Sequence, residues 1–177
     1  MFTLRFRVLA TMILLAAATR LLPHPPNFAP ITAMALFGGV YFEKRWHAFL
    51  VPFVVMIFSD LIIGFHPTIL FVYASFALII LIGLSLRKQM TLIRTASAML
   101  GSSILFFLIT NFSVWLMYET YPKTLAGLIT CYVAAIPFFH NSLVGDLFYS
   151  TVLFGGFALA QRFKPSLSVE RSIETIH

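Results

Sequence analysis

The sequence predicts an all-α polytopic membrane protein with six transmembrane helices and both termini in the cytoplasm. Of its 177 residues, 60% are hydrophobic and 10% are charged, and the mean hydropathy is +0.94. Soluble domains carry about 25% charged residues. The apolar residues form successive runs, and the basic residues gather in alternate links between them. We therefore expect one integral membrane domain over residues 1–177, with no soluble domain of any size.

The apolar runs define the expected helices, because a spanning helix needs about 17–25 mainly apolar residues. The first run follows Arg5 and ends near Ala16-Ala17-Ala18, as a signal peptide does. It continues to Leu22, however, and further runs follow, so we interpret it as an uncleaved first span. The six spans are expected at about residues 4–22, 28–42, 49–65, 68–86, 96–117 and 141–160.

The distribution of basic residues predicts the topology, because cytoplasmic links are enriched in Lys and Arg. With the amino terminus inside, ten of the twelve basic residues, Arg171 among them, lie on the inner side, and only Arg20 and Lys123 lie outside. The apolar region 124–160 is too long for one span and is interrupted by Pro137, His140 and Asn141. A second crossing there would place the basic tail outside. We therefore expect residues 125–139 to lie at or dip into the outer face.

The second run carries small residues that would let another helix approach closely. They are Ala29, Ala33, Ala35, Gly38 and Gly39. The link before this run contains several prolines, each of which fixes its own φ and biases the preceding residue toward extended backbone. We interpret the stretch Arg20–Gly39 as the wall of a ligand site on the outer side.

On this topology, the polar residues that the apolar background does not explain gather at the outer side. Ionisable groups in a membrane are costly and usually face protein or a water-filled cavity. Asp60 and Asp146 could bind a cationic ligand, a proton or a metal, or could instead bond to other helices or pair with Arg20. The candidate substrate-binding residues are Arg20, His24, Asn27, Asp60, His66, Asn111, Trp115, His140, Asn141 and Asp146.

Histidine and aromatic residues add two features to this set. His24, His66 and His140 lie on separate outer links, but their spacing matches no dense metal motif, so no metal site is predicted. His66 follows Gly64-Phe65 and precedes Pro67, a turn that would hold its side chain over a cavity mouth. Asn111 and Trp115 share a helical face that suits either a flat ligand or an interfacial aromatic belt.

Several function classes find no support in the sequence. It has no nucleophile triad, no phosphate-cradling glycine loop and no dense carboxylate pair, so neither an enzyme nor a resident cofactor is expected. The net charge of +6 follows from topology and does not indicate nucleic-acid binding. The single cysteine, Cys131, excludes an internal disulfide. The expected partners are the lipid bilayer and a small-molecule substrate.

Four segments carry a family resemblance. The stretch Arg20–Gly39, with Ser59-Asp60, Thr110-Asn111-Phe112 and the segment Ala135–Asn141, resembles a family of bacterial transport-type membrane proteins. That family is similar to the substrate-binding S components of energy-coupling-factor (ECF) vitamin transporters. The resemblance implies a six-helix S-component fold in the bacterial inner membrane. It also implies an outer substrate site under the links after the first, third and fifth spans.

The resemblance also implies a function and a partner. The expected function is uptake of a vitamin or related cofactor, with cobalamin as the first substrate to consider. S components dock on an ECF transmembrane protein and its ATPases, whereas a cobalamin-binding group works alone. In that group a cysteine after the third span contacts cobalt, and the comparable link here carries His66. The alternatives are a secondary carrier or channel for a small cation or metal, and an assembly or scaffold protein of a membrane complex.

Overall fold

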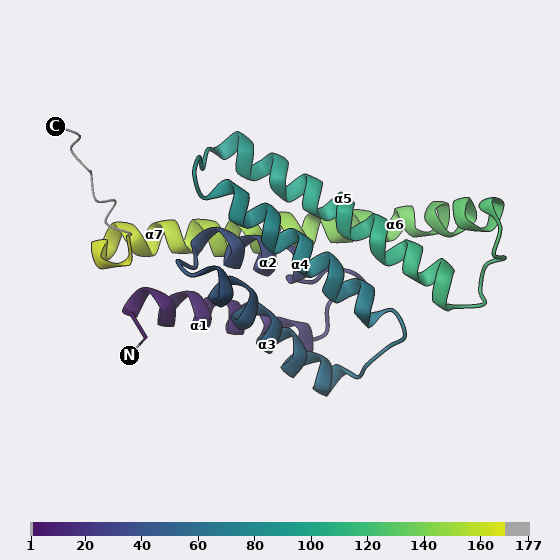
Figure 1. Cartoon of the computed structure of the whole chain (residues 1–177), viewed down its shortest axis with the longest axis horizontal. Coiled ribbons are helices and arrows are strands. Elements are labelled where there is room, and N and C mark those ends of the chain that lie inside the picture. The colour runs from purple at the N-terminus through teal and green to yellow at the C-terminus, as the bar shows by residue number, and fades with distance from the viewer. Residues whose placement is uncertain (1, 169–177) are drawn as a thin grey trace.

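The computed structural model describes residues 2–168, and this part of the chain is helical throughout, without a strand (Figure 1). Four of its helices are long and apolar enough to cross a membrane: α3, α4, α5 and the continuous helix that runs from α6 into α7. The helices are α1 (Leu4–Ala18), α2 (Ile31–Tyr41), α3 (Arg45–Ile63), α4 (Ile69–Leu86), α5 (Leu92–Met117), α6 (Leu125–Ser150) and α7 (Gly156–Phe163).

The predicted interruption of the last apolar region is wrong. Residues Leu125–Phe163 form one helix of 39 residues, in which a π-helical turn, Thr151–Gly155, joins α6 to α7. The hydroxyl of Thr124 caps its first turn, and Pro137 lies inside it. A proline removes one backbone hydrogen bond, which packing against neighbouring helices can offset. At 1.5 Å per residue the helix is about 58 Å long, well beyond a hydrocarbon core of about 30 Å. Its first part therefore extends, with the end of α5, beyond the other helices (Figure 1).

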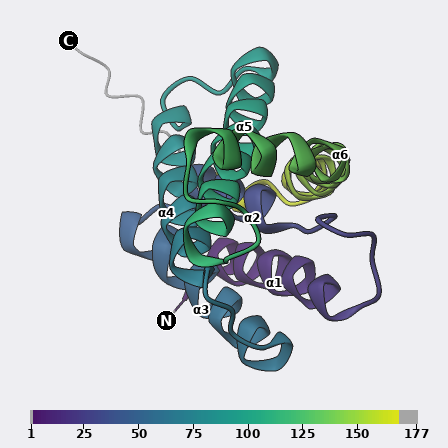
Figure 2. The ribbon, with the colours of Figure 1, turned by 90° about the vertical axis from the view of Figure 1, so that its right-hand side faces the viewer.

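The short helix α2 lies at the centre of the bundle, surrounded by the other helices (Figure 2). Its residues Thr32–Val40 are all buried. The expected close approach is confirmed at Gly39, where an added Cβ would lie 2.4 Å from the Ile80 carbonyl oxygen of α4. A Cβ at Gly83 of α4 would lie 2.5 Å from the Leu36 carbonyl oxygen. The small residues of α2 thus serve packing inside this chain, and Ala33 is fully buried.

Both ends of the described chain lie at the same end of the bundle, together with the α2–α3 and α4–α5 links (Figure 1). Every Lys and Arg of residues 2–168 except Arg20 and Lys123 belongs to segments at this basic end. Arg171 lies outside the described residues. Arg5 of α1 donates to the carbonyl oxygens of Tyr41 (2.9 Å) and Leu167, and Arg87 donates to that of Gly39 (2.7 Å). Two guanidinium groups therefore satisfy carbonyl oxygens at the C-terminal end of α2, where the helix dipole favours cations.

The proline-rich α1–α2 link packs against α6 at the opposite end. The Asn141 side-chain amide donates to the Pro26 carbonyl oxygen at 3.0 Å. Gly145 lets α6 approach the link backbone, since an added Cβ would lie 3.2 Å from the Phe28 Cα. Asn27 adopts φ 63°, a left-handed conformation that asparagine tolerates better than most residues. These contacts hold the link against the middle of the long helix Leu125–Phe163.

Candidate functional site

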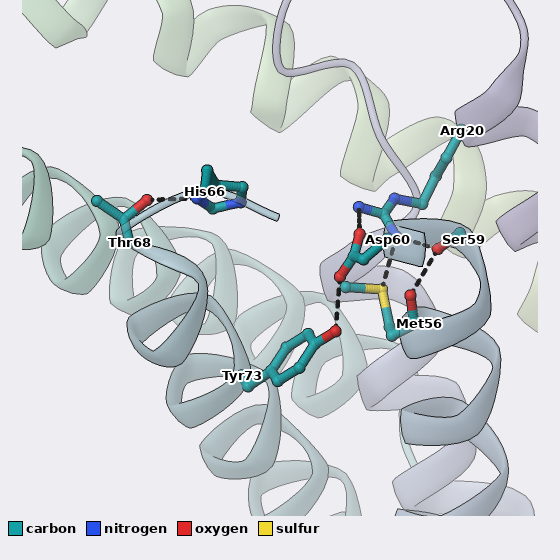
Figure 3. Close-up of polar contacts among 7 residues, drawn as sticks. All are labelled: Arg20, Met56, Ser59, Asp60, His66, Thr68 and Tyr73. Carbon is teal, nitrogen blue, oxygen red and sulfur yellow. Dashed lines mark hydrogen bonds and ion pairs between the residues drawn. The ribbon is translucent and has the colours of Figure 1, made fainter. Parts of the chain in front are cut away.

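Asp60 forms an ion pair inside the protein. Arg20 donates from Nη2 to its Oδ1 at 2.6 Å, and the Tyr73 hydroxyl donates to its Oδ2 at 2.7 Å (Figure 3). Arg20 also donates to the hydroxyl of Ser59, whose own hydroxyl donates to the Met56 carbonyl oxygen. Asp60 is 4% exposed, so both carboxylate oxygens are used inside the bundle. This arrangement favours the structural alternative for Asp60, in which it joins α3 and α4 to the turn after α1.

Asp146 of α6 is equally buried, at 3% exposure, but has a different environment. Ser103 of α5 donates from its hydroxyl to Asp146 Oδ2 at 2.5 Å. The ion pairs within residues 2–168 are Arg5–Glu43 and Arg20–Asp60, and neither includes Asp146. Both aspartates lie in apolar runs of the sequence, but within residues 2–168 only Asp60 has a cationic partner.

Asp146 lines a cavity of about 320 Å³ bounded by α2, α4, α5, α6, the α1–α2 link and the α3–α4 loop. This volume lies near the lower end of the range for small-molecule sites, about 300–1,000 Å³. One part of the wall is aromatic and aliphatic, and another carries hydroxyl, amide, imidazole and carboxylate groups. The polar lining residues are Asn27, Thr32, His66, Thr68, Ser103, Thr110, Asn111, Ser142 and Asp146.

Four of the predicted site residues meet in this cavity: Asn27, His66, Asn111 and Asp146. His66 lies in the α3–α4 loop, where its Nδ1 is 2.8 Å from the Thr68 hydroxyl oxygen, away from the Arg20–Asp60 pair (Figure 3). Its Nε2 is left for another partner. The Asn111 side-chain nitrogen donates to the Phe107 carbonyl oxygen of its own helix.

The other predicted site residues lie elsewhere. The Trp115 indole donates to the Pro122 carbonyl oxygen at 2.8 Å, which stabilises the turn between α5 and α6. His24 is exposed, and its Nδ1 contacts the Pro25 carbonyl oxygen. His140 is exposed on α6 and is not part of the cavity wall, while Asn141 holds the link. The three histidines therefore do not converge, and residues 2–168 contain no cluster of three or more metal-ligating side chains.

Most of the cavity wall was not among the predicted site residues, although the sequence carries a signal for it. On α5 the lining residues Ser103, Phe106, Phe107, Thr110, Asn111 and Val114 recur at the spacing of one helical face. On α6 the corresponding residues are Ala135, Phe138, Phe139, Ser142 and Asp146. The four phenylalanines are not among the predicted site residues, since adjacent phenylalanines in an apolar run predict lipid-facing or packing positions. Their regular alternation with hydroxyl and amide residues indicates two stripes that face a shared cavity.

The fold and the site define a helical, membrane-embedded protein with an internal cavity that is part aromatic and part polar. A family model described as "Family of unknown function (DUF6580)" matches residues 2–167, and the chain belongs to this family. Comparison with the curated proteins and with the solved structures gives no match.

Proposed function

We propose that this chain is an S-component-like protein of the bacterial inner membrane, which binds a small vitamin or related cofactor and mediates its uptake. The observation that carries the proposal is the cavity at the end of the bundle opposite the basic end. If the positive-inside rule applies, the basic end is cytoplasmic and the cavity opens outward. Six crossings, counting α1 and the short α2, then place both termini inside.

The cavity favours a small vitamin over cobalamin. A corrin macrocycle with its nucleotide loop is far larger than a space of about 320 Å³. His66 lies at the cavity wall, where it can contact a small ligand without acting as a cobalt ligand. The alternative of a metal carrier has less support, because Arg20 already neutralises Asp60 and the histidines lie apart.

Filling the cavity is expected to weaken ligand binding. Ala135→Trp places an indole in the space between α5 and α6, whereas Ala134→Trp adds the same group to an exposed position that does not line the cavity. Isothermal titration calorimetry of detergent-purified protein against a panel of water-soluble vitamins measures the ligand affinity of both variants. We expect the wild type and Ala134→Trp to bind the same compound, and Ala135→Trp to bind it at least about tenfold more weakly, a loss of about 1.4 kcal/mol.

Two results would contradict this proposal. Folded wild-type protein that binds no compound of the panel overturns a vitamin-binding function. Equal affinity in Ala135→Trp and the wild type shows that the ligand binds outside the cavity. Proteoliposomes loaded with the purified chain alone then test uptake, since accumulation of the bound vitamin without added ATPases identifies a solitary transporter.

A further inference from the structure

The carboxylate of Asp146 has no cationic partner in the cavity wall. None of the lining residues is Lys or Arg, and His66 is the only other titratable residue in the wall. His66 itself lies at an exposed position beside Thr68 and has no contact with the carboxylate among the hydrogen bonds of residues 2–168. Ser103 donates a hydrogen bond to the carboxylate, and Thr32 adds a second hydroxyl to the wall, but hydroxyl groups solvate a charge without neutralising it. A buried charge of this kind is costly unless it is paired.

The N-terminal end of α2 contributes positive potential at the cavity wall. Ala29, Ile31 and Thr32 line the cavity, and no side chain caps this helix end. A helix N-terminus carries the equivalent of about half a positive charge. It therefore offsets only part of the charge of an ionised Asp146. Asp60, by contrast, has a full guanidinium partner at 2.6 Å.

The aromatic part of the cavity wall suits a flat cation. Phe106 and Phe107 of α5 face the same space as Phe138 and Phe139 of α6, and the rings of Phe107 and Phe139 have centroids 4.6 Å apart. Aromatic faces attract cations, and the attraction is stronger where both are desolvated. The hydroxyl and amide groups of Thr110, Asn111 and Ser142 add hydrogen-bonding positions for ring substituents.

We propose that the ligand of this cavity is a small heteroaromatic compound with a cationic group, which pairs with the Asp146 carboxylate while its ring packs against the phenylalanines. The inference rests on the proposed function and specifies the charge of the substrate. It predicts that an anionic vitamin such as biotin is excluded, because its carboxylate would meet Asp146.

A matched pair of vitamins tests the charge requirement. Pyridoxamine and pyridoxine share one ring, but pyridoxamine carries a protonated aminomethyl group where pyridoxine has a hydroxymethyl group. Thiamine supplies a second, permanently charged cation, and biotin an anion. Titration of wild-type protein with each is expected to give binding by at least one of the two cations. For the matched pair, pyridoxamine should bind at least about tenfold more tightly than pyridoxine, and biotin should not bind.

Asp146→Asn isolates the carboxylate, because the amide keeps the side-chain volume and can still accept a hydrogen bond from Ser103. We expect this variant to lose the preference for the cation over its neutral partner. The wild-type comparison stands even where the variant fails to fold, since it requires no substitution.

The outcomes separate this inference from the proposed function. Wild-type protein that prefers pyridoxine or biotin overturns the cationic class and leaves vitamin binding intact. Binding that needs sodium ions irrespective of ligand charge assigns Asp146 to an inorganic ion and also overturns it. Absence of binding to every compound, including neutral riboflavin and nicotinamide, overturns the proposed function itself.

Discussion

Gly83→Ala is expected to prevent formation of the native bundle. An added Cβ at this position would lie 2.5 Å from the Leu36 carbonyl oxygen and 2.9 Å from the Gly39 Cα, both of which are backbone atoms. Backbone atoms of a fully buried helix cannot move aside as a flexible side chain can. Overpacking in cores costs about 1–3 kcal/mol and occasionally more. Here we expect the upper end of this range or beyond, because α2 and α4 would have to separate along their contact.

Gly101→Ala is the matched control, since the same methyl group added on α5 meets nothing within 4 Å. Size-exclusion chromatography and thermal unfolding in detergent measure both variants. Gly101→Ala should elute and unfold like the wild type, or unfold at a slightly higher temperature, because alanine has the higher helix propensity. A Gly83→Ala protein as stable as Gly101→Ala would contradict the close packing of α2 against α4.

Arg20→Leu is expected to lower the free energy of unfolding by about 3 kcal/mol. Removal of one partner from a buried ion pair costs about 3–5 kcal/mol, because the other charge is left uncompensated. The side chains of Arg20 and Asp60 are only 10% and 5% exposed, so water cannot replace the guanidinium easily. We expect the lower end of the range, because in a membrane the unfolded state also offers alternative partners to polar groups.

The double variant Arg20→Leu/Asp60→Leu provides the test of coupling. Without either charge, the site loses the ion pair but buries no unpaired carboxylate, so the double variant should be more stable than Arg20→Leu alone. Denaturant titrations in detergent give the free energies of unfolding of the wild type, the two single variants and the double variant, which form a double-mutant cycle. Strict additivity of the two single effects would show that Arg20 and Asp60 do not interact.

Much of the helical architecture was predictable from apolar runs and the distribution of charge. The run of residues 69–86 lacks any charged residue and forms α4 almost as expected, and the small residues of α2 pack where their composition indicated. Continuity of α6 was not predictable in the same way. Pro137, His140 and Asn141 look like a helix break in sequence, but the break depends on whether neighbouring helices compensate for one missing hydrogen bond.

The candidate site was predictable in part. Four residues chosen for polarity meet in the cavity, Asn27 and His66 from links and Asn111 and Asp146 from helices. The difference between Asp60 and Asp146 was not available from local sequence, since it depends on an arginine forty residues away from Asp60 in the chain. The aromatic wall was missed because two adjacent phenylalanines in an apolar helix give no local sign of whether they face lipid or a cavity.

Thermal unfolding of Asp60→Asn and Asp146→Asn in ligand-free protein tests most directly the claim that Asp60 is structural and Asp146 serves a ligand. Asp60→Asn weakens the contact with Arg20 and should lower the midpoint temperature of unfolding by several degrees. For a chain of this size, each kcal/mol of lost stability lowers that temperature by about 2–4 °C. Asp146→Asn retains the hydrogen bond with Ser103 and removes an uncompensated charge, so its midpoint should be unchanged or higher. An Asp146→Asn midpoint that falls as far as that of Asp60→Asn would contradict the account.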